Sequence, residues 1–464
     1  MSPVKSLDAR SREQLETYVA ETMRQNHLYG LSISLVSDGN IVYSHGFGTR
    51  SVDPPLPATP DTLYGIGSST KFFTAIAILK LVEKGKIGLN DPVEKYIKSF
   101  KSDSENHPVT IHQLLSHTSG YPDLGMANGV IGHLLGQQSI WSPLGKVEDL
   151  VSHINRAHSE RVATDGTIFM YWNEGYILLG QIIEEASGMK YTDFVKKNIL
   201  DPLGMKRSTF ERSKLEADKD SMVGYFMEKD GSRGPRKFPT HPLIDAAGGL
   251  LSSSNELSNF VEMLINGGTF NGSRIIKKDI LEKAFAPYVR SSFPPSLGEG
   301  SYYGYGITVD KNFLGHLKLG HGGNVAVASA YFGFVPDLKI GVSLASNSDF
   351  LTSPIGDYAL ALLMGKDPEK VLPWVIFQRK VEVISGKYET FKGGVKMVIA
   401  LKGFVLTADI GEGTESMSLP ILIEGNKYFV VQGPDKVELD VKVTSPEKVD
   451  VRFDRMVFHK VGKL

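Results

Sequence analysis

The chain contains no cysteine, has almost no net charge and has no long apolar run. Without cysteine there are no disulfide bonds, thiolate zinc sites, iron–sulfur clusters or cysteine nucleophiles. The 51 lysine and arginine residues nearly balance the 52 aspartate and glutamate residues, for a formal net charge of −1, so the charge favours neither nucleic acid nor an anionic membrane as a partner. No apolar run approaches the roughly 20 residues that a membrane span needs.

The N-terminal 25 residues are charged and have the pattern of an amphipathic helix. No apolar stretch of the signal-peptide type precedes them. We therefore expect a cytoplasmic protein, unless a leader has been removed from the sequence. With 464 residues, 41% of them hydrophobic, the chain is long enough for about two or three domains.

Residues 1–366 combine strand patterns at both ends with helix patterns between them. Two alternating segments meet at residues 38–40 (DGN), which predicts a β-hairpin over residues 31–48. Four stretches have helical periodicity: residues 71–85, 110–120, 173–188 and 254–268. Strand patterns then return, followed by one helix pattern: residues 316–323, 326–336, 338–348 and 354–364. This order predicts an α+β fold, with an antiparallel sheet shared by both ends, flanked by helices, and an inserted helical subdomain.

The composition changes beyond residue 366. Residues 367–380 are expected to form a linker. Residues 381–464 are short β-rich runs separated by Gly-Asn, Gly-Pro-Asp and Ser-Pro-Glu turns, and their even spacing predicts an all-β up-and-down barrel of about eight strands. Such a barrel can hold a ligand or be filled by side chains and serve in assembly. The absence of a site motif favours the second.

Residues 68–71 (SSTK) match the pattern S-x-x-K, which is weak by itself. Composition predicts on the order of three chance matches in such a chain. Further matches do occur, two of them at residues 187–190 and 445–448. The first precedes a helix-ending glycine and the second lies in a Ser-Pro turn, so their context explains both without chemistry.

The segment after Ser68 distinguishes this match from those two. Residues 72–82 are apolar on nearly every side, which predicts a buried helix. Ser68 or Ser69 could simply cap that helix. However, Lys71 stands where a capping box would have Glu or Gln, at the positive end of the helix dipole. Burial alone can lower a lysine pKa by up to about 3–5 units, and a neutral amine one turn from a serine hydroxyl can act as its base. The stretch alone leaves both interpretations open.

Two further groups of residues could carry chemistry. Residues 171–173 (YWN) come just before a helix pattern, where Asn173 would be a good N-cap and Tyr171 a half-buried aromatic side chain. Residues 319–324 (LGHGGN) lie in a strand pattern, and their glycines would let a backbone or a substrate approach closely. A lone His321 in such a place is otherwise most often structural.

Together, the three groups resemble the ordered site motifs of the serine β-lactamase and penicillin-binding-protein superfamily: Ser68-x-x-Lys71, Tyr171-x-Asn173 and His321-x-Gly323. The match is closest to the branch of class C β-lactamases, D,D-peptidases, D-aminopeptidases and related esterases. Supporting stretches extend the resemblance over about residues 15–365: LLSHTSGYPD, NEGYILLGQIIEEASG, DAAGGLLSS and YGYGITVD. The C-terminal barrel resembles the lipocalin-like domain of some peptidases of this branch, including an archaeal one that assembles into a closed oligomer.

The resemblance implies roles for four catalytic residues. Ser68 would be acylated by the substrate carbonyl group. Lys71 and Tyr171 would share the general-base and general-acid roles, since a phenolate near a lysine can accept a proton and later return it. His321 would help to hold the substrate carboxylate or the leaving group.

The resemblance also implies substrate-binding residues. Asn173 would bind the substrate amide. The backbone N–H groups of Ser68 and Asn324 would form the oxyanion hole, and Gly323 would also belong to the substrate-binding residues. The family pattern often has Lys-Thr-Gly where His-Gly-Gly stands here, and a neutral histidine supplies less positive charge for a carboxylate. Four other residues are interpreted as structural or pocket-lining: Ser69, Thr70, His117 and Trp172.

The implied function is that of a serine hydrolase, favouring a peptidase, aminopeptidase or amidase that acts on small peptides containing D-amino acids. An esterase on short acyl esters or a weak β-lactamase is the first alternative. A penicillin-recognising binding protein with little turnover is the second. A catalytically dead scaffold is disfavoured by the intact motif residues.

The expected partners are a small peptide, amide or ester substrate, with no nucleic acid and no membrane, and a homo-oligomer formed through the barrel. No cofactor or metal is expected. The sequence has no H-E-x-x-H, no complete G-x-G-x-x-G, no Walker loop and no G-x-S-x-G. Two histidine pairs are five residues apart, a poor spacing for two ligands on one helix face: His112 with His117, and His153 with His158.

Overall fold

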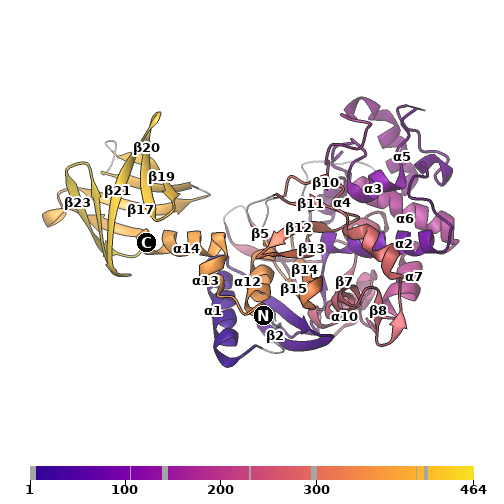
Figure 1. Cartoon of the computed structure of the whole chain (residues 1–464), viewed down its shortest axis with the longest axis horizontal. Coiled ribbons are helices and arrows are strands. Elements are labelled where there is room, and N and C mark those ends of the chain that lie inside the picture. Colours follow the sequence, from indigo (N-terminus) through magenta and orange to yellow (C-terminus); the bar gives the residue numbers. More distant parts are fainter. Residues whose placement is uncertain are drawn as a thin grey trace. The chain divides into compact units, whose positions relative to one another are not determined.

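The structure is a computed structural model that describes residues 7–104, 106–137, 145–228, 231–293, 300–403, 405–411 and 416–464. The chain divides into two compact units, residues 1–366 and residues 367–464 (Figure 1). The N-terminal amphipathic helix is α1 (Ala9–Gln25), and residues 1–6 lie outside the described residues. Within the described residues, no helix is both long and apolar enough to cross a membrane.

A nine-stranded antiparallel sheet forms the centre of the first unit, in the order β10-β11-β12-β13-β14-β15-β1-β2-β3. Its strands are β10 (Val289–Arg290), β11 (Tyr302–Tyr303), β12 (Thr308–Phe313), β13 (His316–Asn324), β14 (Ser329–Val335), β15 (Ile340–Ser346), β1 (Gly30–Ser37), β2 (Asn40–Ser51) and β3 (Leu56–Pro57). The N-terminal strand β1 pairs with β15, with Leu31 opposite Ser346. The predicted sheet, shared by both ends of the unit, is confirmed.

Helices enclose this sheet. They are α2 (Thr70–Glu83), α3 (Ile111–Ser116), α4 (Met126–Leu134), α5 (Val147–Arg156), α6 (Asn173–Ser187), α7 (Tyr191–Val195), α8 (Arg212–Ala217), α9 (Asp245–Gly248), α10 (Ser254–Ile265), α11 (Lys278–Leu281) and α12 (Ser353–Leu363). Three short strand pairs accompany them: β4 (Tyr64–Gly65) with β7 (Leu251–Ser252), β5 (Gly224–Met227) with β6 (Arg233–Arg236), and β8 (Thr269–Phe270) with β9 (Ser273–Arg274).

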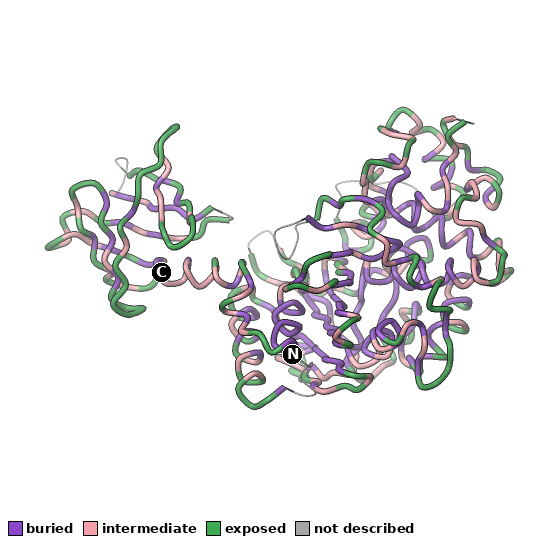
Figure 2. Tube along the Cα trace, viewed as in Figure 1, coloured by how far each residue is buried: buried purple, intermediate pink, exposed green. Residues whose placement is uncertain are grey.

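The sheet is covered on both faces, as the alternation of side chains on β14 shows. Tyr331 faces α12, where Gly356 leaves room for its ring. Phe332 points the other way and stacks on Phe72 of α2, with ring centroids 5.8 Å apart, and it also contacts Phe260 of α10. Every residue of β1, β14 and β15 is buried (Figure 2), as expected for strands that are packed on both faces.

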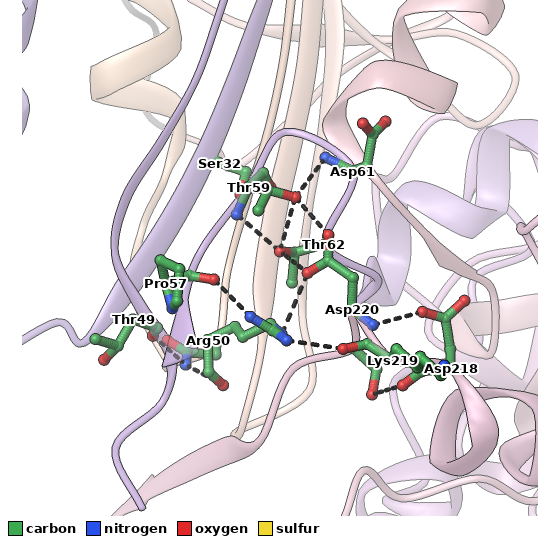
Figure 3. Close-up of polar contacts among 12 residues, drawn as sticks. Ser32, Thr49, Arg50, Pro57, Thr59, Asp61, Thr62, Asp218, Lys219 and Asp220 are labelled. Atoms are coloured by element: carbon green, nitrogen blue, oxygen red, sulfur yellow. Dashed lines mark hydrogen bonds and ion pairs between the residues drawn. The ribbon is translucent and has the colours of Figure 1, made fainter. Parts of the chain in front are cut away.

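A polar network holds the segment that leads to Ser68 (Figure 3). The carboxylate of Asp220 accepts a hydrogen bond from Thr62 Oγ1 at 2.6 Å and forms an ion pair with Arg50 Nε at 3.2 Å. The backbone of the same residue accepts from Leu63 N at 2.8 Å. The next residues form β4, which pairs with β7. The segment that precedes Ser68 is therefore held by its contacts with Asp220 and by the pairing of β4 with β7.

The second unit contains the predicted barrel, which is closed and has eight strands: β16 (Gly386–Glu389), β17 (Lys396–Lys402), β18 (Val405–Ile410), β19 (Met417–Glu424), β20 (Lys427–Gln432), β21 (Asp435–Ser445), β22 (Lys448–Phe453) and β23 (Met456–Gly462). Phe404, expected to begin the third strand, lies outside the described residues. Residues 367–380, which are expected to form a linker, include α13 (Pro368–Val371) and the first part of α14 (Pro373–Ile384). Each of these helices begins with a proline, which is compatible with the first helical position.

Apolar side chains fill the barrel. Val381 and Ile384, in the last turn of α14, belong to the same buried cluster as Val430, Val451 and Phe458 of the strands. The end of α14 therefore packs into the barrel core. This arrangement agrees with the interpretation of the barrel as a filled structural element.

Candidate active site

Ser68 lies in a 3₁₀ turn (Gly67–Ser69) that runs directly into α2. Within residues 62–79, all of which the structure describes, Ser68 is the one residue that is not buried. The helix that follows is buried on every side, as its sequence predicts. Of the three neighbouring hydroxyl groups at positions 68–70, only that of Ser68 can therefore be reached from outside.

The proposed cap of α2 is wrong. Ser69 occupies the N-cap position, but it has helical dihedral angles (φ −58°, ψ −22°) and its side chain makes no capping hydrogen bond. Its hydroxyl group instead donates to His321 O of β13 at 3.1 Å. Because the chain enters through a 3₁₀ turn, the first helical N–H groups have backbone partners and need no side-chain cap.

Lys71 lies one turn after Ser68 and is fully buried. Its Nζ contacts three oxygen atoms: Ser68 Oγ at 3.1 Å, Asn173 Oδ1 at 2.8 Å and Ala247 O at 2.7 Å. Burial lowers the pKa of Lys71 to about 7, although the negative charges of Glu174 and Asp123 oppose this shift. The amine is therefore available in its neutral form near neutral pH.

Tyr171 faces the same hydroxyl group. Its phenol group is close enough to the Ser68 side chain to affect the pKa of the phenol, and Lys71 Nζ lies 4.9 Å from the centroid of its ring. Burial raises the pKa of the Tyr171 phenol above its ordinary value. The tyrosine is thus neutral and can donate a proton, whereas its phenolate form is disfavoured.

His117 binds the residues on either side of Tyr171, a role that the sequence did not suggest. The helix expected over residues 110–120 ends at His117, which has a left-handed backbone (φ 58°). In this conformation its carbonyl oxygen accepts from Met170 N at 2.8 Å, and its Nδ1 accepts from Trp172 N at 3.0 Å. Its ring lies 4.3 Å from that of Tyr171. Because Nδ1 accepts, the proton of the neutral ring is on Nε2.

His321 is buried and neutral. Its Nδ1 lies 2.6 Å from Gly322 O, to which it donates, so Nε2 accepts from Tyr303 OH at 2.9 Å. Burial, together with the positive charge of Lys71, lowers the pKa of His321 to about 3. Both ring nitrogens have protein partners, and the side chain carries no positive charge at neutral pH.

The glycines of the third motif permit a close approach of two backbones, as predicted. A Cβ on Gly323 would lie 1.8 Å from Ile66 O, and a Cβ on Gly67 would lie 2.6 Å from Asn324 N. The backbone N–H of Asn324 is therefore next to the turn that carries Ser68. The Asn324 side chain is used elsewhere: its Oδ1 accepts from Ala326 N at 2.8 Å, and its Nδ2 donates to Asp349.

Asn173 is the first residue of α6 but does not cap the helix, because its Oδ1 accepts a hydrogen bond from Lys71 Nζ. The next residue, Glu174, was not predicted to matter. Its buried carboxylate accepts from Met126 N at 2.9 Å, and burial raises its pKa to about 7. A charged residue in the first turn, directly before an apolar run, was the available signal.

The structure thus brings together residues from four separate segments, around residues 68, 117, 171 and 321. Two other S-x-x-K matches stay apart from them: Ser187 ends α6 before Gly188, and residues 445–448 connect β21 to β22. Among the described residues, no group of three or more histidine and acidic side chains could hold a metal ion.

Residues 15–365 match the family model described as Beta-lactamase, so the chain belongs to the β-lactamase family, whose members are serine hydrolases. Protein flp of Staphylococcus aureus (strain MW2) is 31% identical over 259 residues, which make up 55% of this chain and 49% of that protein. The chain therefore spans about half the length of the curated relatives that it matches first.

Two solved structures extend the comparison. The octameric penicillin-binding protein homologue from Pyrococcus abyssi is 38% identical, with a TM-score of 0.87, over 97% of this chain and 99% of that one. That likeness covers both units. A class C β-lactamase matches with a TM-score of 0.63 over 77% of this chain and 98% of that one, and at 19% identity it shows the fold alone. The predicted resemblance to this superfamily is confirmed.

Proposed function

We propose that the chain is a serine hydrolase that forms an acyl-enzyme on Ser68 and cleaves amide bonds in small peptides, with peptides that contain D-amino acids preferred. The observation that carries this proposal is the set of contacts of Lys71. A neutral amine has two hydrogens and one lone pair. If the hydrogens go to Asn173 Oδ1 and Ala247 O, the lone pair faces Ser68 Oγ at 3.1 Å.

Acylation then follows from this geometry. Lys71 Nζ takes the hydroxyl proton of Ser68 as Oγ attacks the substrate carbonyl carbon. The backbone N–H groups of Ser68 and Asn324 stabilise the oxyanion that forms. Tyr171, neutral because burial raises its pKa, donates its proton to the leaving nitrogen and regains one from the Lys71 ammonium group. In deacylation, water attacks the acyl-enzyme ester, and the proton transfers run in the reverse direction.

The state of His321 bears on the substrate class. A neutral ring with both nitrogens engaged offers no positive charge to a carboxylate. This favours amides and esters over β-lactams, which carry a carboxylate. Short acyl esters are therefore the second candidate substrate, because they need the same nucleophile and oxyanion hole but a weaker general acid.

Assembly is a separate part of the proposal. The homologue from Pyrococcus abyssi is octameric, and it matches this chain over both units. We therefore propose a homo-oligomer formed through the barrel. Light scattering of the full chain measures its mass in solution, and a monomer across the micromolar range would contradict this part alone.

The decisive experiment follows intact mass after addition of a fluorophosphonate or a penicillin. Wild type is expected to form an adduct on Ser68, and Ser68→Ala is expected to form none. Ser187→Ala, in another S-x-x-K match, is the matched control and should behave as wild type. Labelling of Ser68→Ala at the wild-type rate would overturn the assignment. A penicillin adduct that persists for hours would instead favour the binding protein with little turnover.

A substrate panel then separates the remaining classes. D- and L-aminoacyl amides are compared with short p-nitrophenyl esters by kcat/KM. Preference for D-aminoacyl amides is the expected result. Hydrolysis of esters alone would support the esterase alternative.

A further inference from the structure

The loop of residues 122–125 lies beside Asn173. At one end of the loop, Tyr121 stacks on Trp172, with ring centroids 5.1 Å apart and planes 19° from parallel. At the other end, Met126 N donates to Glu174 Oε1 at 2.9 Å. The partners in these two contacts, Trp172 and Glu174, are the residues on either side of Asn173 in the chain. The loop is therefore held next to the side chain that contacts Lys71.

Asp123, in this loop, presents an exposed carboxylate. Its Oδ1 accepts from Gly125 N at 2.7 Å, in a turn local to the loop. No ion pair among the described residues includes Asp123, and the hydrogen-bond partners of Lys71 lie elsewhere. Its negative charge nonetheless opposes the lowering of the Lys71 pKa by burial, and it adds to the raised pKa of Tyr171 and of Glu174. The carboxylate is thus close to the residues around Ser68, and its Oδ2 is available to another partner.

A carboxylate in this position suits a cation. An ammonium group can donate a charge-assisted hydrogen bond to Oδ2, which is stronger than a bond between neutral groups. His321 is neutral and Lys71 has its own contacts, so neither competes for this carboxylate. In a peptide whose first residue is the acyl part, the α-ammonium group is one bond from the Cα that precedes the attacked carbonyl.

We propose that Asp123 binds the α-ammonium group of the substrate's first residue, so that the chain removes single residues from unblocked peptides and aminoacyl amides. This inference rests on the proposed function and narrows it from a peptidase to an aminopeptidase. The alternative is that Asp123 only shapes the loop through its bond to Gly125.

The substitution Asp123→Asn separates these two roles. Asparagine can still accept from Gly125 N, so the turn is kept, while the charge is removed. Asp165→Asn is the matched control, because Asp165 is also exposed and accepts from a backbone N–H two residues later, that of Thr167 at 3.1 Å. Asp165 does not contribute to the pKa shift of Lys71 or of Tyr171.

The test compares kcat/KM for D-alanine p-nitroanilide with that for its N-acetyl analogue. Wild type should prefer the free amine, and Asp123→Asn should lower the ratio of the two values by about 10-fold, the usual scale for a hydrogen bond between charged groups. The control should leave the ratio unchanged. Loss of the Asp123 charge also changes Lys71, but that change affects both substrates alike and cancels in the ratio.

Two results would overturn the proposal: a wild type that prefers the N-acetyl substrate or cleaves neither, and a ratio that Asp123→Asn leaves as it was. Fluorophosphonate labelling of Ser68 in the same samples reports on the proposed function separately. Labelling with an unchanged ratio would therefore reject the role of Asp123 alone.

Discussion

One ion pair from each unit shows a contrast in burial. In the first unit, Lys318 and Asp357 are paired at 2.7 Å, with side chains only 7% and 4% exposed. In the barrel, Lys436 and Glu424 are also paired at 2.7 Å, but about half of each side chain is exposed. Exposed pairs contribute little to stability, whereas buried charges carry a desolvation cost of several kcal/mol per ion.

Lys71 extends this contrast. It is a fully buried lysine with no carboxylate in hydrogen-bond contact, and burial shifts its pKa. The buried cluster of the barrel is made of hydrophobic residues. Perturbed ionisable groups concentrate at functional sites, so the difference places the candidate active site in the first unit and agrees with a structural role for the barrel.

The largest expected effect is on Lys71. We expect Lys71→Arg to lower kcat/KM by about 10³-fold, because arginine stays protonated and cannot act as a base. In wild type the neutral amine is the active form and its pKa is lowered to about 7. Measured kcat/KM should therefore rise with pH up to about 7 and then level off. Lys436→Arg, in the barrel, should leave this profile unchanged. Activity that falls as pH rises through 7 would contradict Lys71 as the base.

The next prediction concerns the stability of the barrel, which should change without a change in the activity of the first unit. Phe458 is fully buried in the barrel, so Phe458→Ala should destabilise the barrel by about 3–5 kcal/mol. Ester hydrolysis per folded molecule should not change. Calorimetry and initial rates measure the two quantities. Lys436→Gln, which removes an exposed ion pair, should change stability by less than about 1 kcal/mol. Loss of hydrolysis in Phe458→Ala while the barrel is still folded would contradict the division of roles.

The smallest effect concerns His117, as a positioning residue for Tyr171. We expect His117→Ala to lower kcat by about 10- to 100-fold with little change in KM, because a small misplacement of a reacting group has effects of this size. His117→Asn should recover much of the loss, since asparagine tolerates the left-handed backbone and can accept from Trp172 N. Equal activity of the two variants, or an effect on KM alone, would argue against this role.

Much of the architecture could be predicted because hydrophobic periodicity is local. The alternating strands around residues 31–48, the buried helix after Ser68 and the eight-stranded barrel all follow from such patterns. Predictions about helix ends were poorer. Gly120 was expected to end the third helix, yet the chain turns at His117, because its backbone and ring bind residues 170–172, far along the chain. The two prolines of the expected linker begin helices instead.

The sequence by itself determined the order of the motifs, and this order was enough to single out Ser68 and Lys71 among several S-x-x-K matches. Only the tertiary structure decided what surrounds them. The buried state of Lys71, the neutral state of His321 and the position of the loop that carries Asp123 depend on contacts between distant segments. Periodicity reports which face of an element is buried, but a pKa depends on the solvent and charges that the whole fold places around a group.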